Sequence, residues 1–173
     1  MDDNKKKQIA KDVYMLSEEN VYRILDSFGK NQNVDITLTY CFVKAFYIRV
    51  VAVYMRNHGR AEDFDGIYSE YKRELLEYYK KNNANIPDDL LKDIAEAFDK
   101  SFDIIESLDF KMIEDSYEFR HHIVDTFELL RKILEKKSKE DIRVDIFENH
   151  VSKIKAEAED IIVYIEKELK NAP

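Results

Sequence analysis

Apolar residues recur every three or four positions along almost the whole chain, the spacing that gathers them on one face of an α-helix. Glycine, proline and polar stretches interrupt this pattern and predict about five or six helices. The first predicted helix can break at Ser17, which precedes two glutamates as an N-cap residue would, and Gly29 is its predicted stop. The predicted helices cover residues 6–28, 36–58 and 63–82, a segment that starts at Pro87, and residues 109–136 and 138–169.

The second predicted helix, residues 36–58, is the most apolar segment of the chain. Lys44 and Arg49 lie inside it, and a charge near the centre of a bilayer costs about 2.5–3.5 kcal/mol on insertion scales. We therefore expect a central helix that is buried by its neighbours rather than a membrane span. Because Lys and Arg extend their charged ends toward water along apolar stems, these two residues are expected to mark its least buried edge.

The scarcity of turn-forming residues supports the same fold class. Three Gly and two Pro in 173 residues leave little material for tight hairpins, which disfavours β architectures. No internal repeat or linker divides the chain. The sequence therefore predicts an all-α fold, a single-domain bundle over residues 1–173.

The last two predicted helices are separated by a short link. Asp109 is the predicted cap of the first of them, and Met112 begins its apolar seam. Ser138 opens an approximate capping box for the second. Because short links join antiparallel neighbours, we expect a C-terminal antiparallel helical hairpin.

The formal net charge of −8 is concentrated in the acidic helical segment 88–118, which contains 11 Asp and Glu against three Lys. Its carboxylates recur at helical spacing opposite an apolar stripe, which predicts a contact surface for a protein partner with a basic surface. No region carries the basic footprint that phosphate contacts need, so direct nucleic-acid binding is disfavoured. The predicted partner-binding residues are Asp89, Asp93, Glu96, Asp99, Asp103 and Glu106.

No metal or cofactor is predicted. Gly66 stands at the sixth position of a calcium-like loop, but its first and last positions are Ala61 and Lys72 instead of carboxylates. A di-iron bundle needs two Glu-x-x-His motifs, and the chain offers one, from Glu118 to His121. The single cysteine lies in the most apolar segment, where a thiol is normally unreactive. A non-enzymatic protein is therefore favoured.

Arg143 and His150 are separated by six residues, and this short string resembles the signature of HEPN-type helical domains, many of which are ribonucleases or toxins. The resemblance implies that the Arg holds a phosphate and that the His acts as a general acid–base on a ribose hydroxyl. In the predicted hairpin, Asp125 lies near the level of His150, with His122 one turn away. An RNA-acting domain that uses Arg143, His150 and Asp125 is the alternative function.

Tyrosines supply a third clue, because Tyr is frequent at protein interfaces. Four of them lie in the third predicted helix, so a homodimer through that face is also expected. The N-terminal residues contain no apolar stretch of a secretory signal, which favours a cytoplasmic location. The favoured function is thus protein–protein interaction, as a regulator, adaptor or inhibitor. The four tyrosines are Tyr68, Tyr71, Tyr78 and Tyr79.

Overall fold

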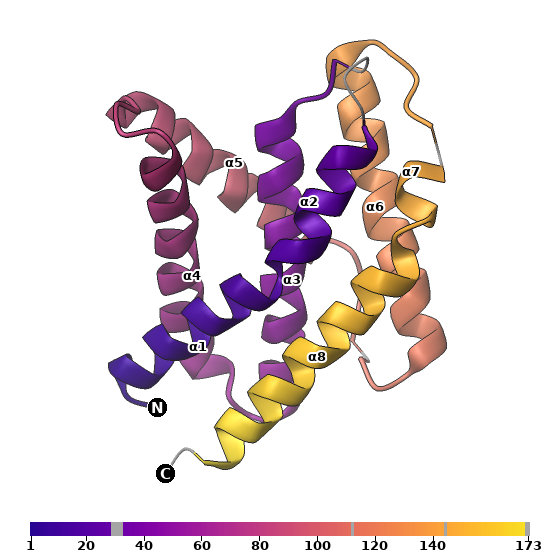
Figure 1. Ribbon diagram of the computed structural model, residues 1–173. Coiled ribbons are helices and arrows are strands. Elements are labelled where there is room, and N and C mark those ends of the chain that lie inside the picture. Colours follow the sequence, from indigo (N-terminus) through magenta and orange to yellow (C-terminus); the bar gives the residue numbers. More distant parts are fainter. Residues whose placement is uncertain (29–32, 112, 144, 172–173) are drawn as a thin grey trace.

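The computed structural model describes residues 1–28, 33–111, 113–143 and 145–171 (Figure 1). All regular structure in these residues is helical, which confirms the predicted class. They form eight helical segments instead of five or six, because the chain breaks at Ser17 and a four-residue turn stands apart before the last helix. Gly29 and Met112 lie outside the described residues. The segments are α1 (Asp3–Leu16), α2 (Glu18–Ser27), α3 (Ile36–Asn57), α4 (Ala61–Asn82), α5 (Asp88–Glu106), α6 (Ser116–Ser138), α7 (Asp145–Glu148) and α8 (Val151–Lys170).

Helix α3 is the core of the fold. It runs through the middle of the other helices and packs against α5, α4, α8, α2 and α6 (Figure 1). Every residue from Thr39 to Met55 is buried, which confirms the predicted central helix. By length and composition α3 could cross a membrane, and 83% of its most apolar window is buried inside the protein.

The predicted position of the two charges in α3 is wrong. Lys44 is 0% exposed and Arg49 is 3% exposed, so neither marks an open edge of the helix. Each charge instead meets a carboxylate from another helix: Glu18 of α2 lies 2.8 Å from the Lys44 ammonium, and Glu106 of α5 lies 3.8 Å from the Arg49 guanidinium. Buried charges survive in proteins when they are paired in this way.

The start of α6 also differs from the prediction. The helix begins at Ser116, and its cap is Asp115, whose carboxylate accepts hydrogen bonds from the amides of Tyr117 (2.9 Å) and Glu118 (3.0 Å). Between α5 and α6, residues 107–111 and 113–115 are not helical, and the Phe110 side chain is buried there; we call this segment the α5–α6 linker. The acidic segment 88–118 is therefore divided, and only its part up to Glu106 belongs to α5.

The C-terminal part does not start a helix at Ser138. Helix α6 continues through Ser138 and ends at Lys139, which has a left-handed conformation with φ of 59°. The turn α7 and a short irregular stretch follow, and α8 begins only at Val151. Helix α8 contacts α6 and also α1 and α3, so the C-terminal helix packs against the N-terminal helix and the central helix (Figure 1).

Replacing Asp115 by Ala should lower the free energy of unfolding by about 1 kcal/mol, because the first amides of α6 lose their acceptor. The matched control is Asp109→Ala, which removes an exposed carboxylate from the linker and should change stability by less than about 0.5 kcal/mol. Urea unfolding of both variants measures the difference. A larger loss for Asp109→Ala would place the helix start at the wrong residue.

Candidate functional site

The predicted acidic stripe follows α5, but its six carboxylates are not equivalent. The carboxylate of Asp99 accepts hydrogen bonds from the Tyr68 hydroxyl (2.7 Å) and the Lys72 ammonium (3.0 Å), both on α4. Glu106 lies between Arg49 and Arg56 of α3. These carboxylates thus join helices within the chain. The other four are exposed and have no ion pair with any described residue: Asp89, Asp93, Glu96 and Asp103.

An apolar groove runs beside two of these exposed carboxylates. Its volume is about 350 Å³, and it lies where α5 meets α3 and α6. Apolar side chains form much of its lining, and Asp93 and Glu96 lie along the α5 side with Lys100. We call it the α5 groove; its lining residues are Leu38, Phe42, Asp93, Glu96, Ala97, Lys100, Ser101, Ile104, Ile133 and Lys137.

The residues of the RNA-acting alternative do not share a helix face. Arg143 precedes α7, is 73% exposed and pairs with Asp145, with 3.0 Å between its Nε and the carboxylate. His150 follows α7, and its Nε2 shares a hydrogen bond of 2.6 Å with the hydroxyl of Ser27 on α2. The predicted helix over residues 138–169 would contain both residues, but α7 ends at Glu148 and α8 begins only at Val151. Asp125 lies on the exposed side of α6.

The tyrosines of α4 make contacts within the chain. Tyr71 is fully buried, and its ring meets Tyr14 and Phe98 at centroid distances of 5.4 and 6.0 Å. Tyr78 stacks on Tyr40 of α3 at 5.1 Å. Much of the face expected to support a dimer is therefore packed against α1, α3 and α5.

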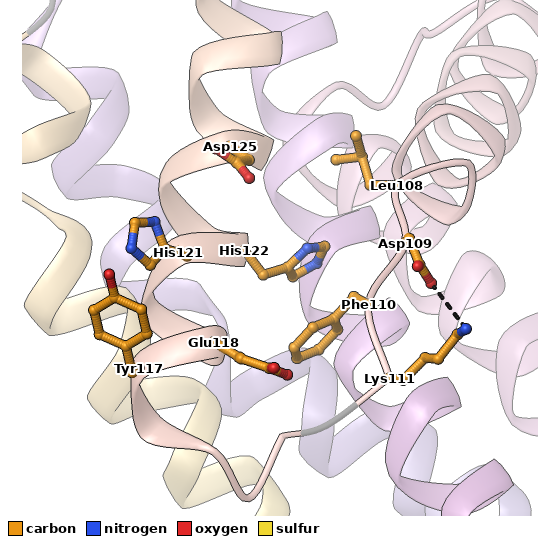
Figure 2. Close-up of a pocket in the computed structure, with 9 residues that line it drawn as sticks. All are labelled: Leu108, Asp109, Phe110, Lys111, Tyr117, Glu118, His121, His122 and Asp125. Carbon is orange, nitrogen blue, oxygen red and sulfur yellow. Dashed lines mark ion pairs between the residues drawn. The ribbon is translucent and has the colours of Figure 1, made fainter.

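A second hollow lies between the α5–α6 linker and the first turns of α6 (Figure 2). Its volume is about 460 Å³. The linker supplies one wall, and side chains on three successive turns of α6 supply the other (Figure 2). We call it the α6 hollow; its lining residues are Leu108, Asp109, Phe110, Lys111, Tyr117, Glu118, His121, His122 and Asp125.

His122 is the buried polar residue of the α6 hollow. Its ring stacks on Phe110 with 3.9 Å between centroids and 2° between planes. Burial lowers the pKa of His122 to about 4, and the nearby Arg49 charge acts in the same direction. The imidazole is therefore neutral at pH 7, and its Nε2 is buried without a hydrogen-bond partner among the described residues.

The histidines do not assemble a metal site. Glu118 and His121 of the single Glu-x-x-His motif both line the α6 hollow, but the ring of His121 lies against Tyr117, with centroids 4.5 Å apart. Within the described ranges, no group of three or more His, Cys, Asp or Glu side chains is placed to hold a metal ion. Cys41 is buried, which raises the pKa of its thiol to about 12 and keeps it protonated.

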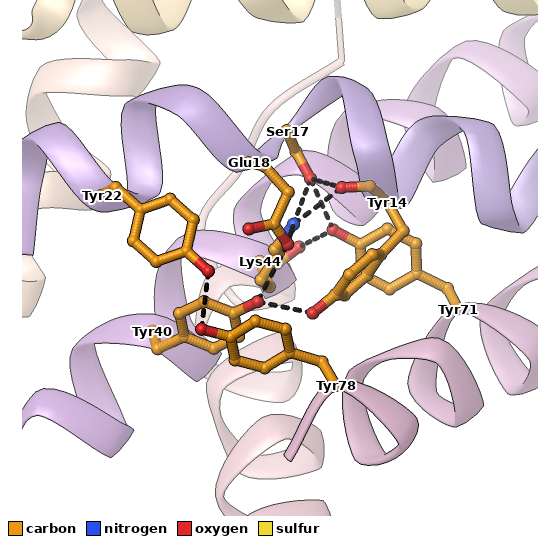
Figure 3. Close-up of polar contacts among 8 residues, drawn as sticks. All are labelled: Tyr14, Ser17, Glu18, Tyr22, Tyr40, Lys44, Tyr71 and Tyr78. Carbon is orange, nitrogen blue, oxygen red and sulfur yellow. Dashed lines mark hydrogen bonds and ion pairs between the residues drawn. The ribbon is translucent and has the colours of Figure 1, made fainter. Parts of the chain in front are cut away.

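A buried polar cluster around Lys44 was not anticipated from the sequence (Figure 3). The Lys44 ammonium donates to the Tyr14 carbonyl (2.7 Å) and the Ser17 hydroxyl (2.8 Å), and it lies 2.8 Å from the Glu18 carboxylate. It also lies 3.7 Å above the ring of Tyr14. We call this set the Lys44 cluster; its members are Tyr14, Ser17, Glu18, Tyr22, Tyr40, Lys44, Tyr71 and Tyr78.

The Lys44 cluster has the features of a structural centre. Its ammonium is completely inaccessible to solvent, so Lys44 is not available as a nucleophile. Burial lowers the pKa of Lys44 to about 8, and the Glu18 carboxylate opposes this shift. The sequence carried one usable signal: no carboxylate stands three or four positions from Lys44 on its own helix, where the residues are Tyr40, Cys41, Tyr47 and Ile48.

Comparisons of the chain with protein-family models, with curated proteins and with solved structures give no match.

The Lys44 cluster makes the free energy of unfolding depend on pH in the alkaline range. The unfolded chain holds the Lys44 proton up to a pKa of about 10.4, whereas the folded protein releases it near 8, so the free energy of unfolding rises with pH across this interval. Between pH 7 and 9.5 wild type should gain about 2 kcal/mol relative to Lys44→Met. The exposed control Lys92→Met should keep the wild-type profile. Parallel profiles for wild type and Lys44→Met would contradict the assignment.

His122 makes stability depend on acid pH in a separate way. Because its pKa falls from about 6.5 in the unfolded chain to about 4 in the folded protein, the unfolded state binds more protons in this interval and stability falls as the pH is lowered. Lowering the pH from 7 to 4.5 should destabilise wild type by about 2 kcal/mol more than His122→Phe, which keeps an aromatic ring. His121→Phe is the exposed control, and an equal effect there would refute the role of His122.

Proposed function

We propose that this protein acts by binding a partner protein with a basic surface, through the exposed face of α5. In this role the protein is a non-enzymatic regulator, adaptor or inhibitor that works in the cytoplasm without a cofactor. It treats residues 1–173 as one helical-bundle domain whose α6 and α7–α8 segments form the C-terminal antiparallel pair.

The observation that carries the proposal is the set of four exposed carboxylates that have no partner among the described residues. Asp89, Asp93, Glu96 and Asp103 project from one helix, whereas Asp99 and Glu106 are occupied by contacts within the chain. A row of free like charges raises the local potential and attracts a surface of the opposite sign. Exposed pairs formed in this way set association rate and specificity.

The α5 groove adds a pocket on the same face in which an apolar side chain of the partner can bind. Binding energy in protein interfaces is concentrated in a few apolar or aromatic side chains that fill pockets, surrounded by a polar rim. The groove, of about 350 Å³, lies directly beside Asp93 and Glu96. A partner that presents one large apolar side chain flanked by Lys or Arg fits both features.

The RNA-acting alternative, with Arg143 and His150, has less support than the α5 face. Arg143, before α7, pairs with Asp145, and His150, after α7, shares a hydrogen bond with Ser27, so both side chains have partners within the chain. A shared phosphate and ribose site requires both side chains to face one cleft.

The test is affinity capture from the native host with the full chain as bait, at low and at high salt. Proteins retained at low salt should be released steeply as salt rises, because exposed ion pairs are screened. The variant Asp89→Asn/Asp93→Asn/Glu96→Gln/Asp103→Asn should weaken capture by about fourfold or more, given about 0.2–1 kcal/mol for each of four exposed pairs. The retained protein, once identified, should carry a basic surface.

A matched control removes the same number of charges elsewhere. Asp26→Asn/Glu140→Gln/Asp141→Asn/Asp160→Asn neutralises four exposed carboxylates outside α5 and should retain the partner. The proposal fails if the two quadruple variants lose the partner equally, or if high salt leaves capture unchanged.

A further inference from the structure

The α6 hollow has the size of a site for a small group, and both apolar and charged side chains line it. Sites for small ligands are concave, largely apolar, and carry a few polar groups that orient the ligand. The hollow of about 460 Å³ has Leu108 and Phe110 on its linker side and Tyr117 on its helix side (Figure 2). It lies outside the α5 groove and shares no lining residue with it.

The charges that face the α6 hollow are predominantly negative. Asp109 and Lys111 of the linker lie 3.5 Å apart and neutralise each other. Glu118 and Asp125, one on each side of His122 along α6, are exposed and have no ion pair in the part of the chain that the structure describes. Two uncompensated carboxylates therefore border an aromatic surface.

His122 provides an independent sign of a missing partner. Its imidazole extends from α6 toward the linker (Figure 2) and is only 6% exposed. Its Nε2 has no hydrogen-bond partner among the described residues, and an unpaired buried polar atom costs about 1–3 kcal/mol. A ligand polar group that reached the ring, directly or through a small shift of Phe110, would relieve this cost.

The aromatic lining favours a positively charged occupant. The Phe110 ring stacks on His122 (3.9 Å between centroids) and on Phe119 (5.6 Å), so its faces are covered and it contributes apolar surface to the hollow. Tyr117 is 72% exposed and leaves its ring available at the rim. Aromatic rings attract cations through their negative faces, and the attraction adds to that of nearby carboxylates.

We propose that the α6 hollow binds an organic cation, an alkylammonium or guanidinium group carried on an apolar stem. The stem lies along Leu108 and Phe110 of the linker, and the cation lies near the carboxylates of Glu118 and Asp125. This proposal does not rest on the function of α5. The cation has two sources, a free small amine or the side chain of a protein arginine, and the experiment distinguishes them.

The probe is phenethylammonium, titrated into the full chain and followed by two-dimensional ¹H–¹⁵N NMR and calorimetry. We expect shifts confined to residues 108–111 and 117–125. The neutral analogue 2-phenylethanol should bind at least about tenfold more weakly, and the anion 3-phenylpropionate more weakly still, because shape is kept while charge changes. Equal binding of the neutral analogue, or shifts centred elsewhere, would overturn the proposal.

Substitutions that preserve shape test the named carboxylates. Glu118→Gln/Asp125→Asn should weaken phenethylammonium binding about three- to tenfold, the range expected when two exposed charges are lost. The control Glu114→Gln/Glu140→Gln removes two exposed charges that do not line the hollow and should leave affinity unchanged. An unchanged affinity in the first variant would refute the site.

Acetyl-arginine amide identifies the source of the cation. Tighter binding of this blocked arginine than of phenethylammonium assigns the hollow to a protein arginine side chain, and the reverse order assigns it to a free amine. Both results support the shared chemistry. Failure of both cations to bind contradicts it.

Discussion

The fold depends on the burial of one ammonium group, that of Lys44, in the middle of its most apolar helix. An unpaired charge there would be prohibitively costly, so acceptors must be supplied from other segments. They come from the junction of α1 and α2: the Tyr14 carbonyl, the Ser17 hydroxyl and the Glu18 carboxylate. The last carbonyls of a helix lack partners within it, so ending α1 at this point makes the Tyr14 carbonyl available. Tyr71 of α4 joins the same centre, since its hydroxyl donates to the Lys44 carbonyl at 3.1 Å.

The periodicity of apolar residues predicted a helix correctly where the local sequence alone determines its start. Helix α3 begins after Asp35 as expected, because the Asp35 carboxylate accepts from the amide of Leu38 at 2.8 Å. The same reasoning failed at Asp109, since several Asp residues in this stretch can cap a helix and only tertiary packing selects among them. Phe110 is buried in this stretch, and the cap of α6 is Asp115. The break at Ser17 was predicted for capping, yet its hydroxyl donates to the Tyr14 carbonyl at 2.9 Å.

The sequence predicted which candidate residues share a face of one helix, but not which of them contact other helices. The spacing placed six carboxylates along α5, but a single sequence contains no information on which of them meet other helices. Asp99 faces Lys72, and Glu106 faces Arg56, contacts between residues 27 and 50 positions apart in sequence. The α6 hollow was even harder to predict from the sequence, because the linker that forms one wall was predicted to be helical. Its histidine and carboxylates were visible as types, whereas their common cavity depends on where α6 begins.

The two buried cations of α3 differ in how completely they are paired. Lys44 has a carboxylate, a carbonyl and a hydroxyl within 2.8 Å. Arg49 has one carboxylate at 3.8 Å, that of Glu106, which is 44% exposed and shared with Arg56. The Nε and Nη1 of Arg49 have no hydrogen-bond partner in the described ranges, and neither has the Nε2 of His122, whose pKa Arg49 lowers. Buried polar atoms without a partner in these ranges also occur elsewhere, including the Oδ1 of Asn20 on α2. The same helix therefore holds one cation that three acceptors surround and one whose single carboxylate is itself open to solvent, so Lys44 is the cation that the packing of α1 and α2 fixes in place.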